Sequence, residues 1–214
     1  TVTPTLRPDE VVTSSAFSAM TNSVIIATSA RALYTLVLDD RHTTEQILLT
    51  DETTEPQAPV TKIVSCVVTG NNGTTTEFFW CIDNTGMAYI WDNIRQTLQG
   101  RHRIADAGQR PVIATNTCTA ESAGTRAPVV LTAGPRPGTI TVHHICTDDQ
   151  SPQFGTVAAT TPLQIPDCTH TVTAMGLAPN GTLWVIAGSV YLCTLNNSTN
   201  LVFKKLEITD DCIR

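Results

Sequence analysis

Short apolar runs, separated by polar stretches, recur at a nearly constant interval along this 214-residue chain. The four strongest runs occupy residues 24–27, 78–82, 129–131 and 183–186. Their first residues lie 54, 51 and 54 positions apart. The runs are rich in β-branched and aromatic residues and are too short for an average helix, so they favour strands. The chain is therefore predicted to repeat one β unit four times.

Weaker strand patterns flank each strong run. One precedes it, at residues 16–20, 63–68, 112–119 and 172–177. Two follow it, the nearer at residues 33–38, 87–91, 139–146 and 190–195, and the farther at residues 47–49, 103–105, 156–158 and 201–208. Short links that carry Gly or Asn, such as Asn84-Thr85-Gly86, join neighbouring patterns and are typical of hairpins. Each unit is therefore predicted to be a four-stranded antiparallel sheet.

One segment of the second unit carries a recognisable motif. Residues 83–92 read DNTGMAYIWD, which resembles the third strand of a WD repeat with its glycine turn and its closing pair Trp91-Asp92. The other units keep an Asp or Asn at the same register but lack the tryptophan. The resemblance implies an all-β fold of the β-propeller kind. It would contain about four four-stranded antiparallel blades within one domain, 1–214, at residues 11–50, 61–105, 111–160 and 171–209.

The number of blades leaves two arrangements open. WD-type propellers generally have more than four blades, so the chain either closes a small ring alone or forms part of a larger propeller. The chain starts with Thr1 rather than Met, and we expect it to be a fragment. Two stacked β-sandwiches are the alternative architecture for sixteen short strands, but a sandwich gives no reason for a repeat of about 50 residues.

Composition and charge narrow the classes of function. Hydrophobic residues make up 41% of the chain, which is enough for a packed core, and the formal net charge is −6. The densest basic cluster is Arg101-His102-Arg103, so no nucleic-acid partner is expected. No apolar run is long enough for a transmembrane helix, so no membrane partner is expected. The seven cysteines form no C-x-x-C pair, which leaves them as buried thiols or structural disulfides and gives no support for a zinc site.

Residues with catalytic chemistry do not gather in any recognisable pattern. The predicted first strands, which would line the central channel of a propeller, hold no acidic residue and no histidine. His143 and His144 are adjacent on a predicted strand, so their side chains point to opposite faces and cannot share a metal ion. Neither a G-x-S-x-G nucleophile motif nor a glycine-rich phosphate loop occurs. We expect no enzyme activity, no catalytic residue, no cofactor and no metal.

The predicted function is a non-catalytic protein–protein interaction or scaffold module within a larger protein or assembly. Protein partners, or other segments of the assembly, are expected to bind through variable insertions at residues 49–60, 94–111, 119–128 and 148–166. The candidate contact residues are Arg101, His102, Arg103 and Phe154, an aromatic expected to be exposed in a loop. Residues 50–59 are expected to be dispensable for folding and needed for partner binding.

A second hypothesis is a secreted, glycosylated propeller that binds or hydrolyses a ligand. It rests on Asn-X-Ser/Thr sequons at Asn72, Asn180, Asn196 and Asn197. Such triplets also arise by chance in a threonine-rich chain. The first hypothesis instead predicts a cytoplasmic protein.

Overall fold

The computed structural model describes residues 6–18, 20–38, 44–106, 112–115, 128–178, 180–194 and 202–206. Sixteen strands and no helix occur in this part of the chain, and they form four sheets that we call blades. Blades 1 and 2 contain β1 (Val12–Ser18), β2 (Ser23–Thr28), β3 (Leu33–Leu38) and β4 (Thr44–Leu48), then β5 (Val60–Thr69), β6 (Thr75–Asp83), β7 (Met87–Asp92) and β8 (Thr97–Arg103). Blades 3 and 4 contain β9 (Ile113–Thr115), β10 (Val129–Ala133), β11 (Thr139–Ile145) and β12 (Val157–Gln164), then β13 (Ala174–Leu177), β14 (Thr182–Ile186), β15 (Val190–Thr194) and β16 (Lys204–Leu206). Within each blade the strands pair antiparallel in chain order.

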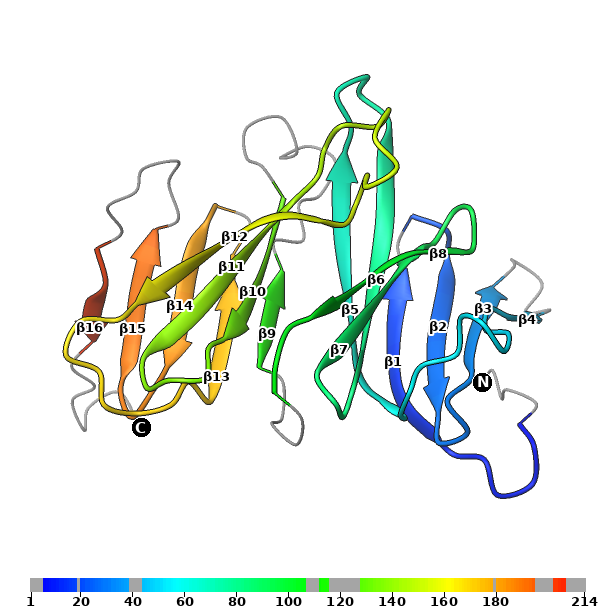
Figure 1. Cartoon of the computed structure of the whole chain (residues 1–214), viewed down its shortest axis with the longest axis horizontal. Helices are drawn as coiled ribbons and strands as arrows, with labels where there is room; N and C mark the ends of the chain where they lie inside the picture. The colour runs from blue at the N-terminus through cyan, green and yellow to red at the C-terminus, as the bar shows by residue number, and fades with distance from the viewer. Residues whose placement is uncertain are drawn as a thin grey trace.

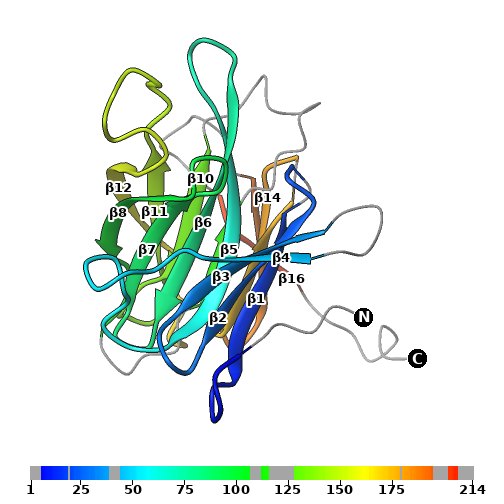
Figure 2. The ribbon, with the colours of Figure 1, turned by 90° about the vertical axis from the view of Figure 1, so that its right-hand side faces the viewer.

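The blades stand side by side with their first strands innermost (Figure 1). β1 packs beside β5, β5 beside β9, and β9 beside β13. Blades 1 and 4 extend to opposite sides in Figure 1, and Figure 2 shows β8 and β12 on one side of the molecule and β4 and β16 on the other. The arc stays open between β1 and β13, so the four blades do not close a ring in this structure.

Neighbouring blades meet in apolar joints. Each joint is named by the two blades that it connects. The side chains buried in joint 1–2 are Ile25, Ala27, Leu33, Val60, Ile63, Phe79, Cys81, Tyr89 and Trp91. Those buried in joint 2–3 are Cys66, Val68, Phe78, Trp80, Ile82, Ala88, Ile90, Ile104, Ile113, Val130, Ile145 and Phe154. Joint 3–4 is built around Leu131, Ile140, Val142, Leu183, Val185 and Tyr191. Alternate residues of a strand point to opposite faces, so one strand can serve two joints. In β6, Phe79 enters joint 1–2 whereas Phe78 and Trp80 enter joint 2–3, and all three are fully buried.

The prediction of four four-stranded antiparallel sheets is confirmed, and the strong apolar runs form β2, β6, β10 and β14. The outer strands differ most from the expectation. β8 begins at Thr97 and β12 extends to Gln164, so the supposed insertions 94–111 and 148–166 contain strands. Most side chains of β12 are exposed, and a polar edge strand lacks the apolar alternation that reveals a strand. Residues 119–127 of a third supposed insertion lie outside the described residues.

One glycine shows how tightly joint 2–3 is packed. Gly155 has φ +79°, and a Cβ added to it would lie 2.1 Å from Cζ of Phe78. Gly73 has φ +84° in a hairpin turn, but a Cβ there would meet nothing within 4 Å. The two positions therefore share the backbone conformation and differ in the space around them.

We predict that Gly155→Ala lowers the free energy of unfolding by about 3 kcal/mol or more, because the buried Phe78 ring must move as well as the backbone. The matched control, Gly73→Ala, should cost about 1 kcal/mol for the left-handed backbone alone. Urea unfolding of both variants checks this. Equal losses would contradict the close packing described for the joint.

Candidate protein-interaction surface

The basic cluster predicted as a contact site is divided between two faces of β8. Arg101 and Arg103 pair with Tyr89 and Met87, whose side chains pack in joint 1–2. His102 lies between them and points to the opposite face. The structure therefore brings the two arginines together on one face and separates His102 from them.

Both arginines are exposed but held in place. The Arg101 guanidinium lies 5.5 Å from the centre of the Tyr89 ring, and its Nη2 donates to the carbonyl oxygen of Thr53 at 2.6 Å. Arg103 Nη1 donates to the carbonyl oxygen of Thr85 at 2.9 Å. A guanidinium has five N–H donors, so each arginine keeps donors for a further acceptor.

Phe154 does not belong to this surface. The expectation that it is exposed is wrong: its exposed fraction is 9%, and its ring packs edge-on against Phe78 with the centroids 5.5 Å apart. The segment before β12 folds back, and Gly155 N donates to the carbonyl oxygen of Cys146 at 3.0 Å. The sequence of a loop does not show which way the loop turns. A loop aromatic residue that packs into a joint therefore looks the same in sequence as one that is exposed.

Two shallow pockets lie at the outer side of joint 2–3. One, of about 210 Å³, has His102 and Arg101 on one wall and Pro152 and Gln153 on the other. The second, of about 170 Å³, lies between Arg103 and the β10–β11 turn. Each pocket therefore has a basic residue of β8 among the residues that line it.

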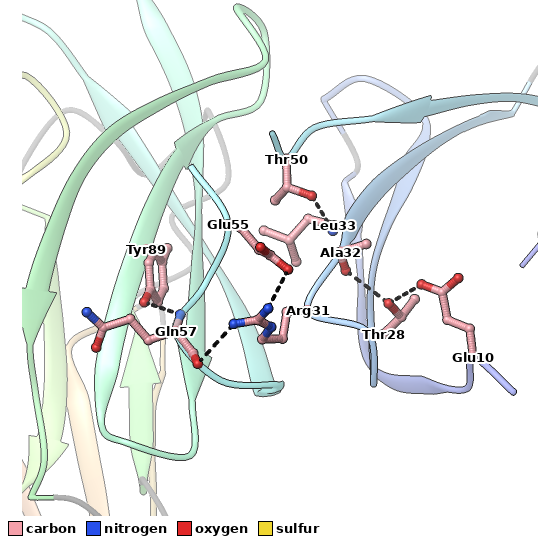
Figure 3. Close-up of polar contacts among 9 residues, drawn as sticks. All are labelled: Glu10, Thr28, Arg31, Ala32, Leu33, Thr50, Glu55, Gln57 and Tyr89. Atoms are coloured by element: carbon pink, nitrogen blue, oxygen red, sulfur yellow. Dashed lines mark hydrogen bonds and ion pairs between the residues drawn. The ribbon is translucent and has the colours of Figure 1, made fainter. Parts of the chain in front are cut away.

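The linker between blades 1 and 2 is part of the joint rather than a dispensable loop (Figure 3). Leu33 N donates to Thr50 Oγ1 at 3.3 Å, and Gln57 N donates to the hydroxyl oxygen of Tyr89 at 2.8 Å. The linker also carries the chain from the outer strand β4 to the inner strand β5. Deleting residues 50–59 would remove these contacts and the length needed for the crossing, which corrects the expectation that the fold survives this deletion.

Arg31 anchors the same linker from blade 1. It lies in the β2–β3 turn with φ +64°, and its Nη2 lies 3.2 Å from Glu55 Oε1. Its Nη1 donates to the carbonyl oxygen of Gln57 at 3.5 Å (Figure 3). The ion pair is partly exposed and adds little energy by itself, but it ties the turn of one blade to the entry of the next.

A buried carboxylate network, which the sequence reading missed, crosses joint 1–2. Glu77 on β6 is 3% exposed and accepts hydrogen bonds from Ser18 of β1 and, at 2.5 Å, from Ser65 of β5. Asn93 Nδ2 donates to Glu77 Oε2 at 3.3 Å and to Ser18 Oγ at 3.0 Å. Among the described residues no basic side chain forms an ion pair with Glu77. The sequence held one signal of this network. Glu77 is acidic at a position of β6 where the strand pattern predicts an apolar residue.

His143 and His144 point to opposite faces, as predicted. His144 Nε2 lies 3.0 Å from Thr161 Oγ1 toward solvent, whereas His143 is 3% exposed inside joint 2–3. His143 Nε2 lies 2.9 Å from Thr132 Oγ1, and the His143 ring meets the His102 ring edge-on at 5.1 Å. Burial, and then the charges of His102 and His144, lower the pKa of His143 to about 4. Burial also lowers the pKa of His102.

The remaining side chains that could ligate a metal ion or act as nucleophiles are scattered over the described part of the chain. It contains no group of three or more His, Cys, Asp or Glu residues that could hold a metal ion, and no helix able to span a bilayer. Cys81, Cys146, Cys168 and Cys193 are free thiols, and burial raises the pKa of Cys81 and Cys193. Raised pKa values hold these two thiols in the unreactive protonated form. Cys118 and Cys212 lie outside the described ranges.

The sequons lie in turns where the structure describes them. Asn72 Oδ1 accepts the backbone N–H of Thr74 at 2.7 Å, and Asn180 Oδ1 accepts that of Thr182 at 2.9 Å. Both side chains therefore close hairpin turns. Asn196 and Asn197 lie outside the described residues.

Comparison with known proteins identifies a similar fold and no relative in sequence. No family model matches the chain, and no curated protein matches it. Among solved structures, one described as "Structure of Dos1 propeller" aligns with a TM-score of 0.54 and 10% identity over 86% of this chain. The fold is propeller-like. The alignment covers 45% of the Dos1 propeller chain, so this chain spans less than half of its length.

We predict that Glu77→Gln destabilises the protein by about 1–3 kcal/mol, because the amide cannot accept at both of its terminal atoms and leaves a buried donor without a partner. Glu52→Gln, at an exposed position of the linker, is the control and should change stability little. Urea unfolding measures both. A loss as small as that of the control would contradict the role assigned to the network.

We predict that His143 makes stability fall as the pH drops from about 6.5 to about 4. In this pH window His143 binds a proton in the unfolded state but not in the folded state. The free energy of unfolding therefore decreases by up to about 3 kcal/mol and then levels off below the pKa of folded His143. His143→Gln should remove this part of the pH dependence, while His144→Gln keeps it. Unfolding titrations across the window check the difference, and identical slopes in all three proteins would contradict it.

Proposed function

We propose that the chain is a non-catalytic module that binds other proteins, or holds them together, as part of a larger protein or assembly. The observation that carries the proposal is a stack of packed blades in which the buried acidic and imidazole side chains bond to groups of the fold itself. Glu77 is occupied by hydroxyl and amide donors, and His143 is enclosed in a joint. Turns and polar outer strands make up much of the surface available to partners, and binding residues are commonly found in such segments.

We place the main partner contact at Arg101 and Arg103. Their anchored guanidinium groups lose little side-chain entropy on binding, and their free donors suit the paired oxygens of a carboxylate. The preferred partner is therefore a protein segment rich in Asp or Glu. His102 contributes less in this proposal because its ring faces His143 in the joint.

We further propose that the four blades form part of a larger, WD-like propeller in the cytoplasm. An open arc and a length under half that of a matched propeller chain support the first point. The Trp91-Asp92 pair that closes β7 supports the WD-like type, and free thiols at Cys81, Cys146, Cys168 and Cys193 favour a reducing compartment. The net charge of −6 argues against nucleic acid as the partner.

The double variant Arg101→Glu/Arg103→Glu should lose capture of acidic partner proteins from a native extract, because reversed charges repel the proposed segment. Arg136→Glu, an exposed arginine in the β10–β11 turn, is the matched control and should capture the same proteins as the wild type. Cross-linking followed by mass spectrometry reads out the captured set, and circular dichroism checks the fold. Unchanged capture by the double variant, or none by the wild type, would contradict the proposal.

A further inference from the structure

Within the described residues, the two ends of the arc each present a blade face without a neighbouring blade, and we propose that these faces bind each other between two copies of this chain. Two chains would then join head to tail and close one ring. The inference rests on the larger propeller proposed above and names what completes it. We call the side of a blade that is turned toward the preceding blade its leading face, and the other side its trailing face.

The trailing face of blade 4 is apolar and open. In β14, Leu183 and Val185 enter joint 3–4, whereas Trp184 and Ile186 point the other way and are 40% and 38% exposed. Leu192 of β15 lies opposite Trp184 and extends the same face. A flat indole beside branched side chains is the kind of surface that the internal joints bury.

The leading face of blade 1 is also apolar. Ile26, Tyr34 and Leu36 form a cluster at its centre, and these three side chains are already buried within the chain. At the margins of this cluster Phe17, which pairs with β2 at Val24, is 55% exposed, and Leu48 is half exposed. These two large apolar side chains leave the margins of the face exposed.

The chain before blade 1 is arranged like the linkers inside the arc. Leu49, Ile104 and Ile165 each precede the first strand of a blade and pack into the joint that this blade makes with the one before it. Leu6 precedes β1 and packs on the cluster of the leading face in the same way. Blade 1 therefore has an apolar leading face and a linker residue placed as at an internal joint.

The two open faces are of complementary kinds. Every internal joint unites the trailing face of one blade with the leading face of the next, and the arc ends in one face of each kind. Blades 1 and 4 extend to opposite sides of the arc (Figure 1). In the proposed pair the second arc lies on the open side and contacts both ends. A head-to-tail contact of this type forms a closed pair when a half-turn relates the copies.

The mass of residues 1–214 in solution tests the proposal, measured by sedimentation velocity from about 1 μM to about 100 μM. The expected species is a dimer of twice the 23.0 kDa chain mass. Trp184→Glu should weaken the dimer at least about 100-fold, because it places a charge in an apolar joint. Ala158→Glu, an exposed position on the outer strand β12, is the control and should leave the dimer unchanged.

A mixing experiment tests the head-to-tail arrangement. Phe17→Glu damages the other face and should also give monomers. A mixture of the Phe17→Glu and Trp184→Glu chains still has one intact pair of faces, so it should form dimers in which each variant contributes one chain. Dimers of this composition are not expected if like faces bind each other.

Several outcomes would overturn the proposal. In the sedimentation experiment, these are a wild-type chain that stays monomeric at every concentration, a wild-type chain that forms open-ended oligomers, or a Trp184→Glu chain that still dimerises. In the mixing experiment, it is a mixture that stays monomeric while circular dichroism shows that both variants are folded. A monomeric wild type that still captures partners through its arginines would contradict the dimer and leave the proposed function intact. A wild-type dimer whose arginine variants still capture the same partners would support the dimer and contradict the proposed function.

Discussion

Every blade of this protein is apolar on both faces, and the rest of the structure follows from that constraint. A four-stranded sheet in water cannot bury two faces by itself, so each blade needs a neighbour on either side. In β6, adjacent aromatic residues such as Phe78 and Phe79 serve two different joints. The middle blades satisfy the requirement within the chain, whereas the outer faces of blades 1 and 4 leave large apolar side chains such as Phe17 and Trp184 partly exposed.

Polar groups inside the joints add specificity to this apolar stacking. The Glu77 carboxylate is satisfied only when β1, β5 and the turn after β7 meet at one register. His143 is tolerated in joint 2–3 as a neutral ring because Thr132 pairs with one of its nitrogens. A slipped joint would leave such groups buried without partners, at a cost comparable to that of a large core substitution. The apolar surface holds the blades together, and the buried polar groups determine the register at which neighbouring blades pack.

The sequence predicts the blades well and the joints poorly, for a physical reason. Strand alternation and turn residues are local signals, so the apolar runs that became β2, β6, β10 and β14 could be located. Contacts across joints are not local: Asn93 meets Ser18, 75 positions earlier in the chain. Phe154 was misplaced for the same reason, because its partner Phe78 lies in another blade. Of the candidate contacts, Arg101 and Arg103 lie together at the surface, whereas His102 and Phe154 turn into joint 2–3.

Stability in this protein comes from the joints, so blades with two joints are held more firmly than blades with one. Amide hydrogen exchange, measured by mass spectrometry on chains dilute enough to be unassociated, tests it most directly. The amides of β6, β7, β10 and β11 should open with a higher free energy than those of β2, β3, β14 and β15. Equal protection in all four blades, or the strongest protection in blade 1 or blade 4, would contradict the account.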